Sequence, residues 1–369
     1  MGCHPKQRPS AAVTTLHTMQ EIARSSTPGE SDSDDSLRSG DPGDMSVAAP
    51  SPHLTPLLDA LTTGDEGVFS AEQARDAGVS HAQLQRLMRH GLVVRVTHGW
   101  YARRDAALDS RELHRRRSVA IQRRLGSAVL SHHSALVAMS LPAFAADHGT
   151  VHLTYRTGQV HRRRQGCVIH RGDASTIDLP DTATTVRCAD AVVQAGLAHP
   201  LAALVAADEA LRTRRATTAQ LEDSLDRYAR RPTAKAVATA LTHADARSES
   251  PAETLARYAL TVLGHTPTPQ YEITTAGHTY RADLALDDGL LIEIDGLLKY
   301  RTDDGDPRTP ADIVEAEKDR EADLVRAGHR LLRLTWKQIV TPDGGLRYDN
   351  LAQLLAAARS GGHAIGHLP

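Results

Sequence analysis

The segment Leu290–Tyr300, LLIEIDGLLKY, constrains the fold more than any other part of the chain. Its apolar residues predict a buried β-strand, yet Glu293 and Asp295 lie within it. Side chains of a strand alternate between its two faces, so both carboxylates share one face with Leu291. Acidic side chains are rarely buried unless they are paired. The strand therefore needs a cation or a wet site beside this face.

A second strand with its own acid precedes this one. The segment YRADLAL, residues 280–286, is followed by the turn residues Asp287–Gly289 and then by the first strand. If the turn closes on these three residues, Asp283 lies opposite Glu293. Like charges facing each other across a strand pair are destabilising. We therefore expect a divalent metal, Mg²⁺ or Mn²⁺, with these two carboxylates as its ligands.

The surrounding segments predict a mixed α/β domain. SESPAETLARYALTVLG predicts a helix that begins at Pro251, and PQYEITT, residues 269–275, predicts a strand. After the two carboxylate strands, a helix is expected over residues 309–328 and a last strand over 329–336. The predicted order is helix, three strands, helix and strand, with a mixed sheet.

This pattern, RADLAL…LLIEIDGLLKY…EKDREADLVRAGHRLLRLTW, resembles the PD-(D/E)XK restriction-endonuclease-like superfamily. It is most similar to uncharacterised domains related to very-short-patch-repair endonucleases, over about residues 248–358. The resemblance implies Asp283 and Glu293 as metal ligands of a DNA endonuclease, with Glu253 as the helix carboxylate. The family's usual Lys is Asp295 here. Lys299 could replace it in orienting water or stabilising phosphate charge.

Structural roles remain open for several of these residues. Glu253 lies three residues after Ser250, which is the spacing of a capping box. Asp295 precedes a glycine and also suits a turn that ends a strand. Lys299 also suits an exposed loop. Arg320 lies in the run EKDRE, which is typical of an exposed helix face with local ion pairs.

A different pattern covers residues 51–105. LLDAL begins a helix, and two further helices have capping-box spacings at Ser70 and Ser80 and glycines at their ends. LVVRVTHGWYARR predicts two short strands about His98–Gly99. Three helices with a tight turn and a terminal hairpin predict a winged helix-turn-helix.

The third of these helices has one apolar face and one polar face. Leu84, Leu87 and Met88 lie together, which leaves Gln and Arg side chains on the opposite side. Gln and Arg can pair bidentately with adenine and guanine edges. The alternative is a solvated helix face, but the arginines of the hairpin favour binding of double-stranded DNA. The candidate DNA-binding residues are Gln85, Arg86, Arg89 and Arg95.

Residues 106–246 predict a basic α+β domain. Eleven Arg against two acids lie between Arg111 and Arg171, and the runs 114–118 (HRRRS) and 161–166 (HRRRQG) would contact phosphates without reading sequence. Only five of the 43 basic residues are Lys, so a solvated surface rich in Arg is the alternative.

Several histidines of this domain show no recognised spacing of metal ligands, so we expect structural roles for them. They are His132, His133, His148, His152 and His170.

The segment GVFSAEQARDAGVSHAQLQRLMRHGLVVRVTHGWYARR, followed by AVLSHHSALVAMSLP and VHLTYR, resembles the AbiEi-type antitoxins of type IV toxin–antitoxin systems. The resemblance is strongest over residues 52–104 and weaker to about residue 245. It implies a winged helix that binds promoter DNA and a cognate nucleotidyltransferase-like toxin.

The chain is thus expected to be an α/β multidomain protein with tails at 1–50 and 361–369 and a nuclease-like domain at 247–360. Basic and acidic residues nearly balance, 43 against 45, so any nucleic-acid surface must be local. No apolar run approaches the roughly 18 residues of a membrane span, and a cytoplasmic protein is expected. Two functions remain open: a metal-dependent DNA endonuclease, or a DNA-binding regulator whose nuclease-like domain is inactive.

Overall fold

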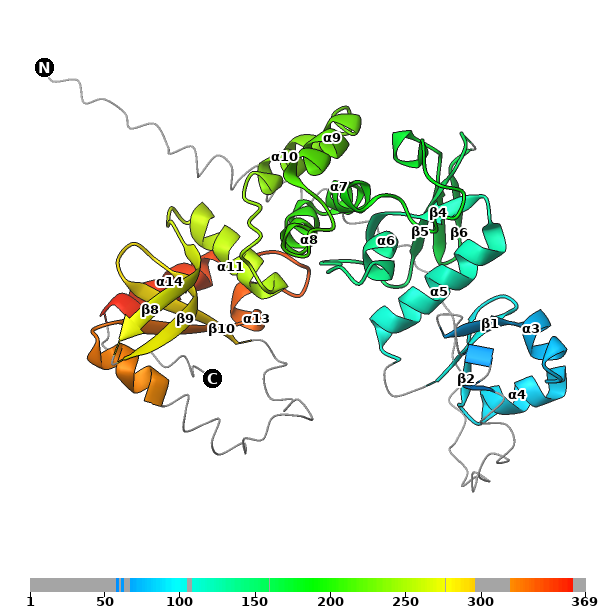
Figure 1. Ribbon diagram of the computed structural model, residues 1–369, viewed down its shortest axis with the longest axis horizontal. Coiled ribbons are helices and arrows are strands. Elements are labelled where there is room, and N and C mark those ends of the chain that lie inside the picture. The colour runs from blue at the N-terminus through cyan, green and yellow to red at the C-terminus, as the bar shows by residue number, and fades with distance from the viewer. Residues whose placement is uncertain are drawn as a thin grey trace, which may run out of the picture. The chain divides into compact units, whose positions relative to one another are not determined.

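The computed structural model describes residues 58–59, 61–62, 67–104, 108–158, 160–275, 277–295 and 319–360. They form two compact units, 58–195 and 196–360, whose boundary lies within helix α7 (Cys188–Ala198). Both units combine helices with sheets, as an α/β multidomain chain should (Figure 1). The predicted tails and Lys299 lie outside the described residues. The predicted domain boundaries at 105 and 246 stay predictions.

The first unit begins with a small three-stranded antiparallel sheet and two helices. Strands β1 (Val68–Ser70), β2 (Val93–Thr97) and β3 (Trp100–Arg103) have the order β1-β3-β2. Helices α3 (Ala71–Asp76) and α4 (His81–Arg89) both begin at capping boxes, as predicted. Strand β1 was not predicted, because three residues are too short to show an alternating pattern.

One apolar cluster joins these helices to the sheet. Leu84 and Leu87 of α4 are buried with Phe69 and Tyr101, whose rings stack with centroids 5.9 Å apart. Met88 is partly buried against the same cluster. The predicted apolar face of this helix is confirmed, and its other face is left on the surface.

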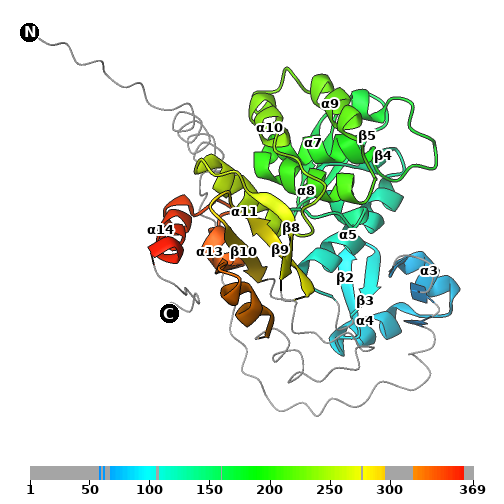
Figure 2. The same cartoon turned by 60° about the vertical axis from the view of Figure 1, so that its left-hand side comes forward.

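Helix α5 (Ser110–Leu125) packs against the three-stranded sheet and also against a second sheet (Figure 2). The second sheet has the order β4-β5-β7-β6 and is followed by a short 3₁₀ turn, η1 (Ala174–Thr176). Helix α6 (His132–Ala138) packs on β4 and β5. The strands are β4 (Ala128–Leu130), β5 (Val151–Tyr155), β6 (Arg162–Arg164) and β7 (Cys167–His170).

The expectation that residues 114–118 contact phosphates is wrong. Arg116 is only 7% exposed and donates to the Arg103 carbonyl at 2.6 Å and to Glu112 at 2.7 Å. Arg115 also pairs with Glu112, at 2.7 Å, and His114 is fully buried. This run lies where α5 covers two sheets, so its charged side chains form contacts within the unit.

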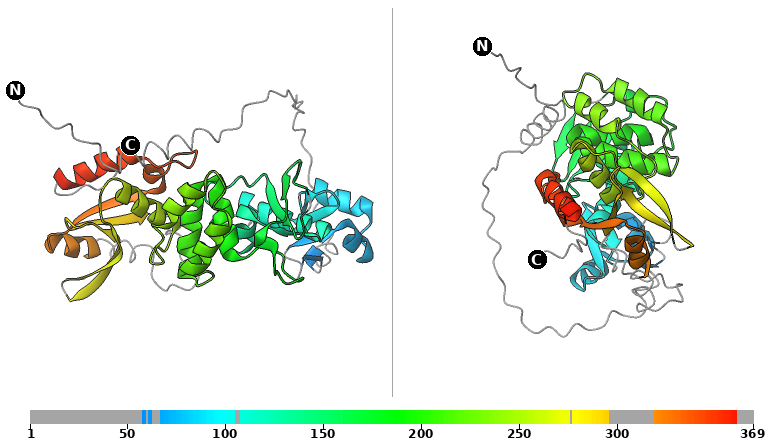
Figure 3. Two further views of the ribbon diagram at one scale, coloured as in Figure 1. Left: turned by 90° about the horizontal axis from the view of Figure 1, so that it is seen from above. Right: turned by 90° about the vertical axis from the view of Figure 1, so that its left-hand side faces the viewer.

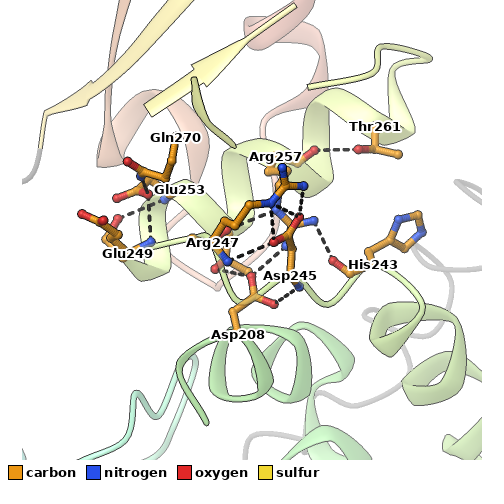
Figure 4. Close-up of polar contacts among 12 residues, drawn as sticks. Asp208, His243, Asp245, Arg247, Glu249, Glu253, Arg257, Thr261 and Gln270 are labelled. Atoms are coloured by element: carbon orange, nitrogen blue, oxygen red, sulfur yellow. Dashed lines mark hydrogen bonds and ion pairs between the residues drawn. The ribbon is translucent and has the colours of Figure 1, made fainter. Parts of the chain in front are cut away.

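The second unit begins with helices joined by a buried polar cluster (Figure 4). Asp208 of α8 accepts hydrogen bonds from the Arg257 guanidinium and the Asp245 backbone N–H, both at 2.7 Å, and from the Thr254 hydroxyl at 2.8 Å. The cluster therefore ties α8 to α11. The helices are α8 (Pro200–Arg212), α9 (Thr218–Arg227), α10 (Ala234–Leu241) and α11 (Pro251–Val262).

A four-stranded sheet of order β11-β10-β9-β8 follows, in which β10 and β11 are parallel and the other pairs are antiparallel. The predicted element order and the mixed sheet are confirmed. Helix α14 and helical residues 319–326 cover opposite faces (Figure 3), so residues 290–294 of β10 are all buried. The elements are β8 (Thr268–Thr275), β9 (His278–Ala285), β10 (Leu290–Asp295), β11 (Arg330–Thr335), α13 (Trp336–Ile339) and α14 (Tyr348–Ser360).

Candidate functional site

Strands β9 and β10 meet in the predicted register. The turn between them closes on residues 287–289, and Leu284 pairs with Ile292. Continuing this register by one residue would bring Asp283 opposite Glu293, but the paired residues end at Leu284 and Ile292. The two acids therefore come from neighbouring strands, each one residue beyond this last pair.

Asp283 lies at the point where the paired residues of β9 and β10 end. Its half-buried carboxylate accepts a hydrogen bond of 2.7 Å from the backbone N–H of Ile294. A side-chain oxygen thus serves here as the acceptor that a neighbouring strand would otherwise supply.

The cation next to Glu293 is Arg320, which lies in helical residues 319–326. Its guanidinium donates to both carboxylate oxygens, through Nη1 to Oε2 at 3.1 Å and through Nη2 to Oε1. It also donates to the Arg281 carbonyl at 3.1 Å. Glu293 is 7% exposed and the Arg320 side chain 18%. Arg320 was expected on an exposed helix face. That expectation is wrong, because its guanidinium pairs with the buried carboxylate of Glu293.

This arrangement of the two carboxylates does not fit a Mg²⁺ ion. Mg²⁺ requires oxygen ligands at about 2.0–2.1 Å in nearly octahedral geometry. Both oxygens of Glu293 face a guanidinium fork, and one oxygen of Asp283 faces an N–H group. Metal binding by this pair therefore requires Arg320 to move away, and it stays a prediction.

Glu253 is held at the start of α11 and reaches toward β8 (Figure 4). Its backbone N–H donates to Ser250 Oγ at 3.2 Å, which is the helix cap expected from the spacing. Its carboxylate, 6% exposed, accepts from the Glu249 N–H at 2.9 Å and from Gln270 Nε2 at 2.7 Å. A structural role therefore accounts for the buried carboxylate of Glu253.

Gln270 links this helix end to the carboxylate strands. The pairs on either side of it, Pro269 with Leu284 and Tyr271 with Ala282, place it opposite Asp283. Its φ of 53° is unusual for a residue other than glycine. The row Glu253, Gln270, Asp283 and Glu293 thus crosses four elements, α11, β8, β9 and β10.

The remaining residues of the predicted nuclease site are less well placed. Asp295 is exposed at the end of β10, beside Thr335 of β11. Lys299 lies outside the described residues. The sequence indicated that Glu293 needs a cation but not that Arg320 supplies it, and no sequence signal singled out Gln270.

The predicted DNA-binding side chains lie on one exposed face of α4 and on the hairpin beside it. Gln85, Arg86 and Arg89 are exposed, with the two arginines in the last turn of the helix. Arg95 of β2 is exposed and lies 2.8 Å from His98 Nδ1. Arg103 of β3 is instead paired with Asp59. This surface offers guanidinium and amide groups at a helix face that can enter a groove.

Residues 60–104 match the family model described as a transcriptional regulator, AbiEi antitoxin. The match includes the three-stranded sheet, α3 and α4. No curated protein matches the chain. Within the described ranges, no helix combines the length and the apolar character that a membrane span requires.

Proposed function

We propose that this protein binds double-stranded DNA through α4 and the hairpin β2–β3 and acts as an AbiEi-like transcriptional regulator. The observation that carries the proposal is the family match over residues 60–104. The exposed polar face of α4 within this match supports it. In this proposal residues 58–104 act as a winged helix-turn-helix with α4 as the recognition helix.

The side chains of α4 have distinct tasks in this proposal. Arg86 and Arg89 pair bidentately with guanine edges in the major groove, and Gln85 pairs with adenine. Arg95 and Arg104, both exposed, contact phosphates. Base contacts provide specificity, whereas phosphate contacts make the affinity depend on salt.

The test is a gel-shift titration with DNA from upstream of the protein's own gene. Arg86→Ala combined with Arg89→Ala should weaken binding at least tenfold, since each bidentate base contact contributes about 1–3 kcal/mol. Arg230→Ala combined with Arg231→Ala is the matched control, because it removes the same charge from exposed positions of the other unit. Equal affinity of the α4 variant and the control would contradict the proposal.

The proposed partner is a nucleotidyltransferase-like toxin encoded beside this gene. Expression of the toxin should impair growth, and co-expression of this protein should suppress that effect. The α4 variant should also suppress it if suppression does not need DNA binding. A neighbouring methyltransferase or repair gene would favour the second candidate function instead.

The second candidate is a metal-dependent DNA endonuclease, favoured by the carboxylates of Asp283 and Glu293, which lie on adjacent strands one residue beyond the pair Leu284–Ile292. Plasmid DNA should be nicked in Mg²⁺ or Mn²⁺, and Asp283→Ala should abolish the nicking. Asp287→Ala is the control, because it removes an exposed acid from the neighbouring turn. Equal activity of the wild type and Asp283→Ala would exclude this function for the carboxylate pair.

A further inference from the structure

Three histidines far apart in the sequence meet on the second sheet of the first unit. His132 is the first residue of α6, His152 lies in β5 and His170 ends β7. Each offers one ring nitrogen, and these three atoms lie within 4.8 Å of one another. We expected structural roles for these histidines, and the sequence did not predict that the three side chains lie together.

The strand register explains why two of them meet. Strands β5 and β7 are parallel, with His152 beside Val168 and Thr154 beside His170. His152 and His170 are therefore diagonal neighbours on one face, with Nδ1 and Nε2 only 3.0 Å apart. The ring of His132 stacks on that of His170, with centroids 4.1 Å apart.

The distances are close to those of a metal site. Zn²⁺ binds imidazole nitrogen at about 2.0–2.1 Å in tetrahedral geometry, which separates two ligand nitrogens by about 3.3 Å. The three nitrogens lie within 4.8 Å of one another, so separations shortened by up to about 1.5 Å, with the stacked ring of His132 turned relative to that of His170, would complete the geometry. Between His152 and His170 a single proton must bridge the two nitrogens, and a metal ion would replace that proton and accept both lone pairs.

The protein also holds His132 in place from outside the cluster. The Ser131 hydroxyl lies 3.0 Å from His132 Nδ1, and the backbone N–H of His132 donates to Gln194 Oε1 at 3.0 Å. A hydrogen bond to a ring nitrogen, such as the Ser131 contact, fixes the ring orientation of a metal-ligating histidine, whereas the Gln194 contact holds only the backbone. The φ of His132 is 52°, a costly conformation that concentrates at functional sites.

The ligand atoms restrict the class of metal. All three are imidazole nitrogens, whereas hard cations such as Ca²⁺ and Mg²⁺ take oxygen ligands. Neutral imidazole ligands suit Zn²⁺, Cu²⁺ and Ni²⁺.

We propose that His132, His152 and His170 form a binding site for one divalent transition-metal ion, with Zn²⁺ as the metal best suited to the ligands. Three protein ligands leave the fourth tetrahedral position to water or another group. His161, whose ring centroid lies 5.3 Å from that of His170, is the neighbouring imidazole that could fill it. The proposal does not depend on DNA binding or cleavage.

The test uses the untagged full chain, stripped with EDTA and dialysed against Zn²⁺. Metal analysis should find one tightly held Zn²⁺ per chain, and Co²⁺ in its place should give the intense visible absorption of a tetrahedral nitrogen site. His152→Gln combined with His170→Gln should remove this ion and the absorption. His278→Gln, at an exposed position of the other unit, is the matched control and should keep both.

A second measurement distinguishes the loss of the metal site from a failure of the variant to fold. Zn²⁺ should raise the thermal unfolding midpoint of the wild type and of His278→Gln, because a ligand that binds only the folded state stabilises it. The double variant should show no such rise. The proposal is overturned if the wild type holds no more Zn²⁺ than the double variant, or if its Co²⁺ form lacks tetrahedral absorption.

Discussion

Removal of the Arg320 side chain should destabilise the second unit severely. Arg320→Ala leaves the carboxylate of Glu293, 7% exposed, without the guanidinium that contacts both its oxygens. Removing one partner of a buried ion pair costs about 3–5 kcal/mol. Because whole domains are stable by only about 5–15 kcal/mol, this is a large fraction of the unfolding free energy.

Urea unfolding followed by circular dichroism measures this loss. With a slope of about 2 kcal/mol per M, a loss of 4 kcal/mol lowers the unfolding midpoint by about 2 M. Arg326→Ala is the matched control, because this side chain is 72% exposed and should lose less than about 1 kcal/mol. Adding Glu293→Ala to Arg320→Ala should recover part of the loss, since it removes the unpaired charge.

The same variant tests whether Arg320 occupies the place of a metal ion. Mg²⁺ at 100 times its dissociation constant would stabilise the folded variant by about 2.7 kcal/mol and should leave the wild type unchanged. The reasoning about Glu293 is refuted if Arg320→Ala loses no more stability than Arg326→Ala. A variant that Mg²⁺ does not stabilise would refute metal binding by Asp283 and Glu293.

Three further perturbations test other parts of the structure. Asp208→Ala leaves Arg257 buried without its carboxylate and should cost about 3–5 kcal/mol in urea unfolding. Ser80→Ala removes the cap of α4 and should cost about 1 kcal/mol in the same assay. Burial lowers the pKa of His114 from 6.5 to about 4, so its contribution is complete above pH 6.5 and up to about 3 kcal/mol is lost as the pH falls toward 4. Urea midpoints across this range measure that loss.

Each of these changes has a control variant in the same chain. Asp226→Ala, at an exposed position of α9, should cost less than about 0.5 kcal/mol, and so should Ser360→Ala at the end of α14. His114→Gln should flatten the pH dependence relative to the wild type. An Asp208→Ala variant as stable as Asp226→Ala, or an unchanged pH dependence in His114→Gln, would contradict the burial argument.

Local features of the fold could be predicted from the sequence, whereas contacts between distant segments could not. The capping boxes at Ser70 and Ser80 and the turn at residues 287–289 depend on neighbours within four residues, and all three are observed. The turn fixed the register, which is why the pairing of β9 with β10 up to Leu284 and Ile292 could be predicted, whereas the placement of Asp283 opposite Glu293 stays a prediction.

The parts that escaped prediction depend on tertiary packing. Arg320 reaches Glu293 across 27 positions of sequence, and its helix carries charges that also suit a solvated face. His132 and His170 belong to elements whose order in the sheet cannot be read from spacing. Arg116 is buried because α5 covers two sheets, and an Arg-rich run gives no sign of this.

Strand β6 has a consequence for association between copies of the chain. It is an edge strand of the β4-β5-β7-β6 sheet, only three residues long, and all three are exposed arginines. A sheet edge can add a strand from another molecule and so start aggregation. A second copy presenting the same edge would bring three positive charges against three more, and their repulsion disfavours edge-to-edge pairing at β6.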